Sequence, residues 1–411
     1  MRLELFIAKR LIFGKKHKNS ISAPIIKIAV IAIALSLIMM LVAVATGVGL
    51  QHKIREKIAA FNGHIQIFNY DNNTSEVSVN PVSVHQDFYP EFTSVEGIEH
   101  IQGVALKGGI IRTEETFEGI IAKGVGKDYK WDYFKEYLIA GVLPDYSAER
   151  NEEVLISKYL ADRLNFEVGT EFYAFFLKDE TNRIPNQVKF TITGIYDSGF
   201  REFDATYIFV DIRHIQRINK WGADEVGSFE IFIEDFDALR QKGNEIYGKT
   251  LATLDSQTIA DKYYYIFEWL SLFDFNIAVI IGIMIIVGGI NIITALLVLI
   301  LERTRMIGIL KALGSTNWSI RKVFLYHAAY LIAVGLFWGN VIGLGMLFLQ
   351  QKFGFITLDA ATYYVTEAPV YLNFLHILLL NAGTLVLCVI MLLIPSYIIT
   401  KITPVKAITF E

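Results

Sequence analysis

Four long runs of apolar residues dominate the pattern of this chain. Asp, Glu, Lys and Arg are absent from all four, which cover residues 28–50, 275–301, 323–351 and 368–400. At about 1.5 Å per residue, each run as a helix exceeds the ~30 Å hydrocarbon core of a bilayer. The first run is also too long for a cleavable signal peptide, so we expect it to remain as an anchor. We predict an α-helical membrane protein with four transmembrane helices, at 25–50, 273–301, 323–350 and 373–400.

The pattern changes between the first two runs, over residues 51–272. Ile54, Ile58 and Phe61 have helical spacing, so the first transmembrane helix is expected to continue as a stalk, matched by a second stalk helix at 261–275. Alternating segments predict strands at 64–70, 103–111, 116–122, 171–177, 187–196, 207–210 and 228–233. Helices are expected at 157–164, 211–219 and 236–251. This predicts a large mixed α+β domain in two lobes, lobe 1 from 62–115 with 220–258 and lobe 2 from 116–218.

Charge is distributed unevenly between the segments outside the runs. Residues 1–27, 302–322 and 401–411 together carry 14 basic and 3 acidic side chains, although the whole chain has 38 basic and 42 acidic residues. Because basic loops favour the cytoplasmic side, both termini (1–24 and 401–411) and the loop 302–322 are predicted to be cytoplasmic. The domain 51–272 and the short loop 351–372 are then predicted to lie outside.

Composition and motifs exclude several classes of protein. With 53% hydrophobic residues and a net charge of −4, the chain is not a soluble nucleic-acid-binding protein. One cysteine, Cys388, rules out an intramolecular disulfide framework. The phosphate-binding loop, GxSxG and HExxH motifs are all missing from the sequence. We therefore predict no catalytic, cofactor-binding or metal-binding residues in this chain.

Small and polar residues within the runs favour helix packing. Gly335, Gly339 and Gly343 recur every four residues and predict a close contact with another helix. Asn291 and Asn340 are expected to form interhelical hydrogen bonds rather than to line a path. Because the runs contain no charged residue, transport coupled to an ion relay is not expected.

The loop 302–322 carries the most informative local pattern. Met306, Ile309, Leu310 and Leu313 fall on one helical face, and Gly314 is expected to end that helix. Such a short amphipathic helix could lie on the membrane surface or dock in a groove of a cytoplasmic partner. The pattern alone does not decide between the two.

Several motifs resemble those of one transporter family. The segment ERTRMIGILKALG at 302–314 resembles the cytoplasmic motif of FtsX/MacB-type ABC transporter permeases, and residues 395–408 resemble their C-terminal pattern. Within that family the chain is most similar to the lipoprotein-releasing permeases of the LolC/LolE type. That similarity rests on residues 7–10, 19–22, 63–65, 183–187, 190–191 and 194–204 (GIYDSGFREFD).

This resemblance implies a fold and a function. The fold would be a four-helix membrane domain with a MacB-like two-lobed periplasmic domain, in the bacterial inner membrane. The chain would be the permease subunit of an ABC transporter that extracts lipoproteins for transfer to the outer membrane. A separate LolD-like ATPase would bind ATP and Mg, and the stalks would transmit its movement mechanically. A second permease copy or a paralogue would complete the complex. The resemblance assigns coupling to the ATPase to Glu302, Arg303, Met306, Ile309, Leu310, Leu313 and Gly314.

The resemblance also implies a site for a periplasmic LolA-like chaperone. In LolC-type permeases a hook loop recruits the chaperone, and the corresponding residues here are Arg183, Ile184, Pro185 and Gln187. The candidate loop 177–187 is shorter than such a hook, which is a departure from the LolC pattern. Alternative functions are a MacB-like efflux or lipid-export permease, and an FtsX-like regulator that controls a periplasmic hydrolase by mechanotransmission.

Overall fold

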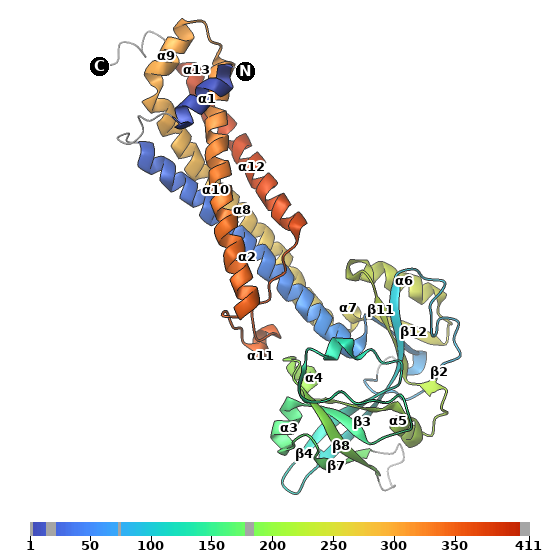
Figure 1. Ribbon diagram of the computed structural model, residues 1–411. Helices are drawn as coiled ribbons and strands as arrows, with labels where there is room; N and C mark the ends of the chain where they lie inside the picture. Colours follow the sequence, from blue (N-terminus) through green and yellow to red (C-terminus); the bar gives the residue numbers. More distant parts are fainter. Residues whose placement is uncertain (1–2, 14–21, 73–74, 177–184, 403–411) are drawn as a thin grey trace. The chain divides into compact units, whose positions relative to one another are not determined.

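The computed structural model describes residues 3–13, 22–72, 75–176 and 185–402, which form two compact units. The first unit, called the bundle here, comprises Met1–Gln51, Leu270–Thr357 and Glu367–Glu411. The second, called the domain, comprises His52–Trp269 and Leu358–Thr366. Figure 1 shows the long helices of the bundle and the strands of the domain.

Four long helices confirm the predicted membrane architecture. They are α2 (Ser22–Asn62), α8 (Tyr264–Glu302), α10 (Asn317–Phe353) and α12 (Phe374–Ser396), and each is apolar and long enough to cross a bilayer. With 41 residues, α2 is about 60 Å long, twice the thickness of the hydrocarbon core. The first expected stalk, residues 51–61, is therefore the continuation of α2 without a break.

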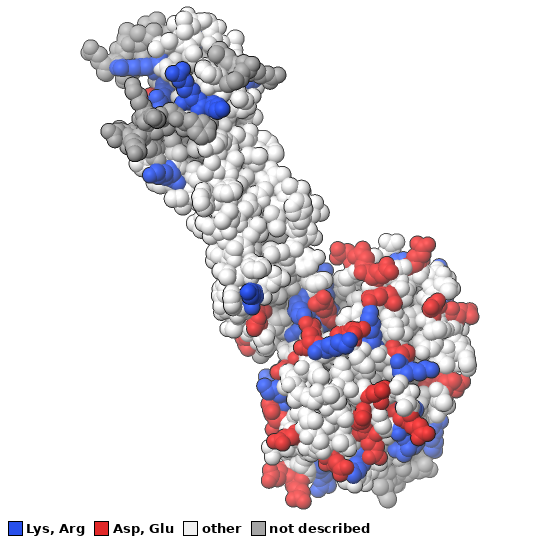
Figure 2. All heavy atoms as spheres, in the orientation of Figure 1, with Lys and Arg blue, Asp and Glu red and all other residues white. Residues whose placement is uncertain are grey.

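The bundle is held together by an apolar core between these helices. Its buried side chains include Leu37 of α2, Leu296 of α8, Phe324 of α10 and Leu392 of α12. Three short helices, α1 (Leu3–Phe13), α9 (Thr304–Ala312) and α13 (Ile398–Lys401), complete the bundle. Figure 2 shows an uncharged surface along the long helices, with basic residues gathered at the end that carries α1 and α9.

The domain is built on one ten-stranded sheet. The strand order is β12-β1-β11-β3-β4-β9-β6-β8-β5, and β7 pairs with both β3 and β8. Since β7 connects β3 to β8, the strands β3-β4-β9-β6-β8-β7 close into a ring of six. The bounds are β1 Ile65–Asn69, β3 Ile98–Arg112, β4 Phe117–Val125, β5 Leu138–Gly141, β6 Glu153–Ser157, β7 Glu171–Phe176, β8 Asn186–Tyr196, β9 Tyr207–Asp211, β11 Ser228–Ile233 and β12 Leu254–Thr258. A separate two-stranded sheet pairs β2 (Val82–Ser83) with β10 (Glu225–Val226).

The long strand β3 belongs to both parts of the sheet. Its first half pairs with β11, and its second half pairs with β4 and β7. The expected lobe boundary at 115/116 falls between β3 and β4, which pair with each other at nine residue positions from Val104 to Arg112. The sheet is thus continuous across the division that the sequence suggested.

Short helices begin where strands end, and polar side chains start them. Ser157 at the end of β6 accepts a hydrogen bond from the Leu160 amide and begins α3 (Lys158–Leu164). Asp211 at the end of β9 accepts one from the Arg213 amide and begins α5 (Ile212–Asn219). Such caps satisfy backbone donors that have no partner within the helix. The remaining helices are α4 (Arg201–Asp204), α6 (Leu239–Lys249), α7 (Ile259–Lys262) and α11 (Ala360–Tyr363).

Two predicted helices differ from the structure in extent. The helix expected at 236–251 is a 3₁₀ turn at Phe236–Ala238 followed by α6. The stalk helix expected at 261–275 is interrupted, because α7 ends at Lys262 and α8 begins at Tyr264. Tyr263 between them has ψ near +41°, outside the helical range, so the second stalk starts with a short separate turn.

Candidate functional site

The helix α9 presents apolar side chains on two different faces. Ile307 is fully buried, and Met306 and Leu310 pack against the core of the bundle. Ile309 and Leu313 instead point outward, with 53% and 78% of their surface exposed. The four residues predicted to share one face are therefore divided between the bundle core and the exposed surface. Ile307, the residue that anchors this helix, was not among the residues predicted for this face.

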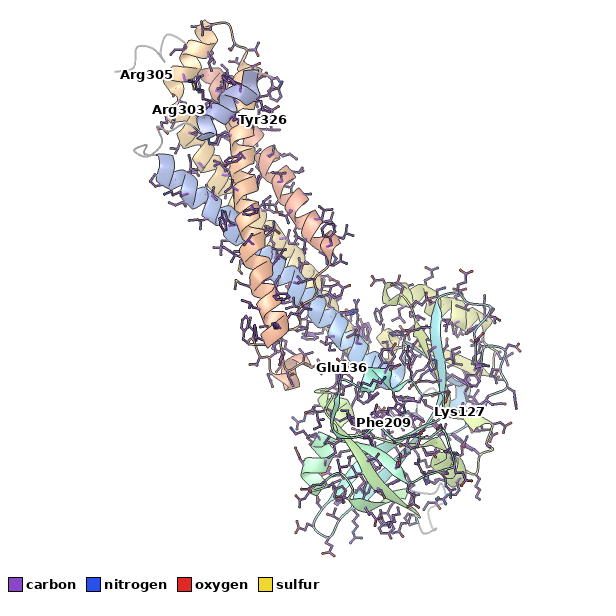
Figure 3. The ribbon with its side chains drawn as sticks, in the orientation of Figure 1. Lys127, Glu136, Phe209, Arg303, Arg305 and Tyr326 are labelled. Atoms are coloured by element: carbon purple, nitrogen blue, oxygen red, sulfur yellow. The ribbon has the colours of Figure 1, made fainter. Side chains whose placement is uncertain are left out.

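Hydrogen bonds fix α9 to the end of the bundle. The Lys311 ammonium donates to the carbonyl oxygens of Ile399 and Ile402, both at 2.7 Å. Gly314 follows the helix with φ of +86°, a left-handed conformation that favours glycine, so the predicted helix end has a physical reason. Glu302 is the last residue of α8, and Arg303 precedes α9. Figure 3 shows Arg303 and Arg305 at this end of the bundle.

The three glycines of α10 lie against α2. A Cβ added at Gly335 would be 2.8 Å from Ile33, and one at Gly339 would be 3.0 Å from the Ala34 carbonyl oxygen and from Leu37. At Gly343 the nearest atom, from Leu41, would be 3.1 Å away. A larger residue at Gly335 would require the helices to shift, and at Gly339 and Gly343 it would crowd the contact with α2.

Replacing Gly339 by leucine should push α10 away from α2. Overpacking a close contact costs about 1–3 kcal/mol, so we expect a lower midpoint of thermal unfolding for the full chain in detergent. The matched control is Gly345→Leu on the same helix, where an added Cβ meets nothing within 4 Å. Equal midpoints for the two variants would contradict the packing role of Gly339.

The two asparagines considered for interhelical bonding behave differently. Asn340 of α10 and Asn381 of α12 exchange two side-chain hydrogen bonds of 2.7 and 3.0 Å. Asn291 of α8 donates to the carbonyl oxygen of Val287, one turn earlier in its own helix. The interhelical bond predicted for Asn340 is thus present, with Asn381 as its partner, whereas the one predicted for Asn291 is not observed among the described residues.

The stalk helix α2 ends in a buried socket of the domain. Phe61 stacks on Phe203 with ring centroids 4.4 Å apart, and its ring lies 5.0 Å from Phe134 and 5.9 Å from Phe209. Figure 3 shows Phe209 in the interior of the domain. Gly63, with φ of +65°, ends the helix, and an added Cβ there would be 2.9 Å from Glu230. Close packing thus fixes the end of the stalk in the domain.

A buried ion pair completes this socket. The Lys123 ammonium donates to the Phe61 carbonyl oxygen at 2.6 Å and to the Glu230 carboxylate at 2.7 Å, and both side chains are almost fully buried. Gln102 donates a further hydrogen bond to Glu230 at 2.9 Å. Burial lowers the pKa of Lys123, and the adjacent Glu230 opposes that shift. The cation satisfies a carbonyl group that the helix end leaves without an internal partner.

The end of α2 also makes polar contacts with the start of the second stalk. The Lys262 ammonium and the Tyr263 hydroxyl each donate to the Asn62 side-chain oxygen at 3.0 Å. Burial lowers the pKa of Lys262 to about 8. At the neighbouring His64, Nδ1 accepts a hydrogen bond from the Ile233 amide at 2.9 Å, and burial lowers the pKa of this histidine to about 4. These contacts join the two stalks to each other and to β11.

Comparison with known families identifies the architecture. The model of the MacB-like periplasmic core domain matches residues 28–247, more than half of the chain. The model of the FtsX-like permease C-terminal region matches residues 278–404. The chain belongs to the FtsX/MacB family of ABC transporter permeases. This confirms the resemblance drawn from the 302–314 motif.

Curated relatives of this FtsX/MacB-family permease include lipoprotein-releasing proteins. It is 21% identical over 273 residues to the lipoprotein-releasing system transmembrane protein LolC of Xylella fastidiosa, covering 63% of this chain and 65% of that relative, slightly under two thirds. It is 20% identical to LolE of Haemophilus influenzae, with both chains covered completely. A third relative, the macrolide export ATP-binding/permease protein MacB of Campylobacter jejuni, is 29% identical over 31% of this chain and 18% of its own length.

Among solved structures, the periplasmic region of MacB from Actinobacillus actinomycetemcomitans is similar to part of this FtsX/MacB-family permease. The identity is 16% and the TM-score 0.33, covering 50% of this chain and 92% of the other.

The candidate hook loop of the permease connects β7 to β8. Gln187 lies in β8 opposite Phe175 of β7, and Pro185 directly precedes β8. Arg183 and Ile184, like residues 177–182, lie outside the described residues. Within the described part of the chain, no group of three or more His, Cys, Asp or Glu residues could hold a metal ion.

Proposed function

We propose that this permease extracts lipoproteins from the inner membrane, for transfer to the outer membrane, in a complex driven by a separate ATPase. The observation that carries the proposal is the alignment with a lipoprotein-releasing LolE protein over the full length of both chains. The segment 194–204, one of the stretches that resemble the Lol branch, comprises the last three residues of β8 and most of the connection to β9, including α4. A second permease copy or a paralogue would complete the complex.

The exposed face of α9 is the proposed docking surface for the ATPase. Ile309 and Leu313 would enter a groove of that partner, which would bind ATP and Mg. Two continuous helices support mechanical transmission, since α2 and α8 each include residues of both the bundle and the domain. We propose that both termini and α9 are cytoplasmic and the domain periplasmic, because the basic residues gather near α9. Pro185 and Gln187 stay candidates for chaperone contact.

Depletion of the permease in its native host tests the proposed cargo. Outer-membrane lipoproteins should accumulate in the inner membrane, measured by fractionation and mass spectrometry, and re-expression of the wild-type chain should restore their sorting. Normal lipoprotein sorting after depletion would contradict the proposal. The 29% identity to MacB favours export of another substrate as the second candidate. Retained macrolides or peptides in depleted cells, with lipoproteins correctly sorted, would support that alternative.

A further inference from the structure

The connection between α10 and α12 contains a segment that folds with the domain. Residues 358–366, called the tab here, belong to the same compact unit as residues 52–269. The Leu358 amide donates to the Thr366 carbonyl oxygen at 2.9 Å, which closes the tab on itself, and α11 forms its central turn. Val365 is only 4% exposed. The tab is thus a structured part of the domain that lies, along the chain, between two helices of the bundle.

Aromatic packing holds the tab against the domain. The Tyr364 ring stacks on Phe200, with centroids 4.4 Å apart, and meets the Trp269 ring edge-on at 6.0 Å. Phe200 is itself fully buried and stacks on Phe203. Tyr364 has φ of +60°, a left-handed conformation that is unfavourable for any residue with a side chain. Such a conformation persists only where the surrounding contacts enforce it.

Lys57 of the first stalk joins the tab to the segment that receives it. Its buried ammonium donates to the carbonyl oxygen of Ser198 and, at 3.0 Å, to that of Tyr364. The Asp204 carboxylate accepts a hydrogen bond of 2.6 Å from the Ser198 hydroxyl, which folds residues 198–204 into a compact turn. Burial lowers the pKa of Lys57 to about 8, so the amine stays mostly charged at neutral pH. Two residues of the 194–204 motif therefore hold the tab, Phe200 by direct stacking and Ser198 through Lys57.

The two connectors between the tab and its helices are short. Four residues separate Phe353 from the tab, and seven separate the tab from Phe374. At no more than about 3.6 Å per residue, the first connector can span only about 14 Å. Hydrogen bonds also fix the connectors to the bundle. Gln350 bonds to the backbone of Ile356 and Ala368, and the Tyr371 amide donates to the Ala45 carbonyl oxygen at 3.0 Å.

We propose that the tab is a third mechanical connection to the domain, through which α10 and α12 act on the 194–204 segment, with Lys57 as its positioning residue. The inference rests on the proposed function, because it concerns movement driven by the ATPase. A movement of α10 or α12 would reach the connection between β8 and β9 through the contact of Tyr364 with Phe200, in addition to any movement passed along the two stalks. The short connectors and their hydrogen bonds to the bundle support this role, because a segment that only covered the domain surface could be attached by long, unbonded loops.

The test measures a movement in the full chain assembled with its ATPase in nanodiscs. In a Cys388→Ala background, spin labels are placed at Val168→Cys in the domain and Leu349→Cys in α10, both at exposed positions. The distance between the labels is measured with and without ATP and vanadate. One variant carries six inserted Gly/Ser residues in each connector, after Thr357 and after Thr366, between the tab and the residues that Gln350 holds. These insertions slacken the connectors and leave the residues of the tab unchanged. The same two insertions placed together after Glu114, in the exposed turn between β3 and β4, are the matched control.

We expect the slack variant to lose at least half of the ATP-dependent distance change while it still hydrolyses ATP. Lys57→Met and Tyr364→Ala should have the same effect, whereas Tyr364→Phe, which keeps the stacked ring, should behave as wild type. A full-sized distance change in the slack variant would overturn the tab as a connection. The absence of any ATP-dependent change in the wild-type complex would instead overturn the proposed function, and this inference with it.

Discussion

Replacing Ile309 and Leu313 together by aspartate is expected to weaken binding of the ATPase at least about 100-fold, equivalent to about 2.7 kcal/mol. Both side chains are more than half exposed in the isolated chain, so the change should not disturb the bundle. In the complex each carboxylate would lose its hydration without gaining a partner, which costs several kcal/mol per charge. Co-purification of the ATPase and lipoprotein release should both fall, and the binding constant can be measured in detergent.

The matched control places the same two charges elsewhere. Ile139 and Val142 at β5 are exposed to a similar degree, 53% and 65%, so Ile139→Asp/Val142→Asp should leave ATPase binding unchanged. The structure also explains why Leu310 is unsuitable for this test, because Leu310 packs against the bundle core and a charge there would destabilise the chain itself. Wild-type binding by the Ile309/Leu313 variant would exclude this face as the docking surface.

The largest loss of stability is expected for Lys123→Met. This change leaves the Glu230 carboxylate buried without its cation and the Phe61 carbonyl without its donor. Removing one partner of a buried ion pair typically costs about 3–5 kcal/mol. The free energy of unfolding of the domain, followed by denaturant titration of the full chain in detergent, should fall by that amount.

Two further variants test the cause of this loss. Lys123→Met/Glu230→Gln removes both charges and keeps an acceptor for Gln102, so it should recover at least half of the lost stability. Lys130→Met breaks the more exposed Lys130–Glu99 pair, with side chains 26% and 39% exposed, and should cost less than about 1 kcal/mol. Similar losses for Lys123→Met and Lys130→Met would contradict the proposed role of burial.

The elements that could be predicted from the sequence are those whose own residues carry a recognisable pattern of apolar and polar positions. The transmembrane helices follow from the length of the uncharged runs. β11 was predicted with the bounds that it has, because Ser228–Ile233 (SFEIFI) begins with the polar–apolar alternation of a strand. By contrast, β12 reads Leu-Asp-Ser-Gln-Thr and has no strand pattern. It becomes a strand because it pairs with β1 along five residues. β6 was missed because its five residues run directly into α3.

The candidate site was predicted only in part, for a similar reason. Helical periodicity placed Met306, Ile309, Leu310 and Leu313 near one another but could not show which of them face the bundle. That depends on contacts with distant segments, such as the hydrogen bonds from Lys311 to residues 399 and 402. The residues of the tab likewise have no local pattern that predicts their packing against the domain. Its partners Lys57 and Phe200 are more than 150 residues away from Tyr364 in the sequence.

The pairing of β1 has a consequence for how the chain folds during synthesis. β1 follows directly after α2, yet its partners are β11 and β12, about 160 to 190 residues later. The first strand of the domain therefore has no partner until nearly the whole domain has been synthesised, and such long-range pairings slow folding. Its unpaired edge could meanwhile associate with other chains. The nascent domain should need protection from aggregation until residue 258 has emerged, shortly before α8 begins.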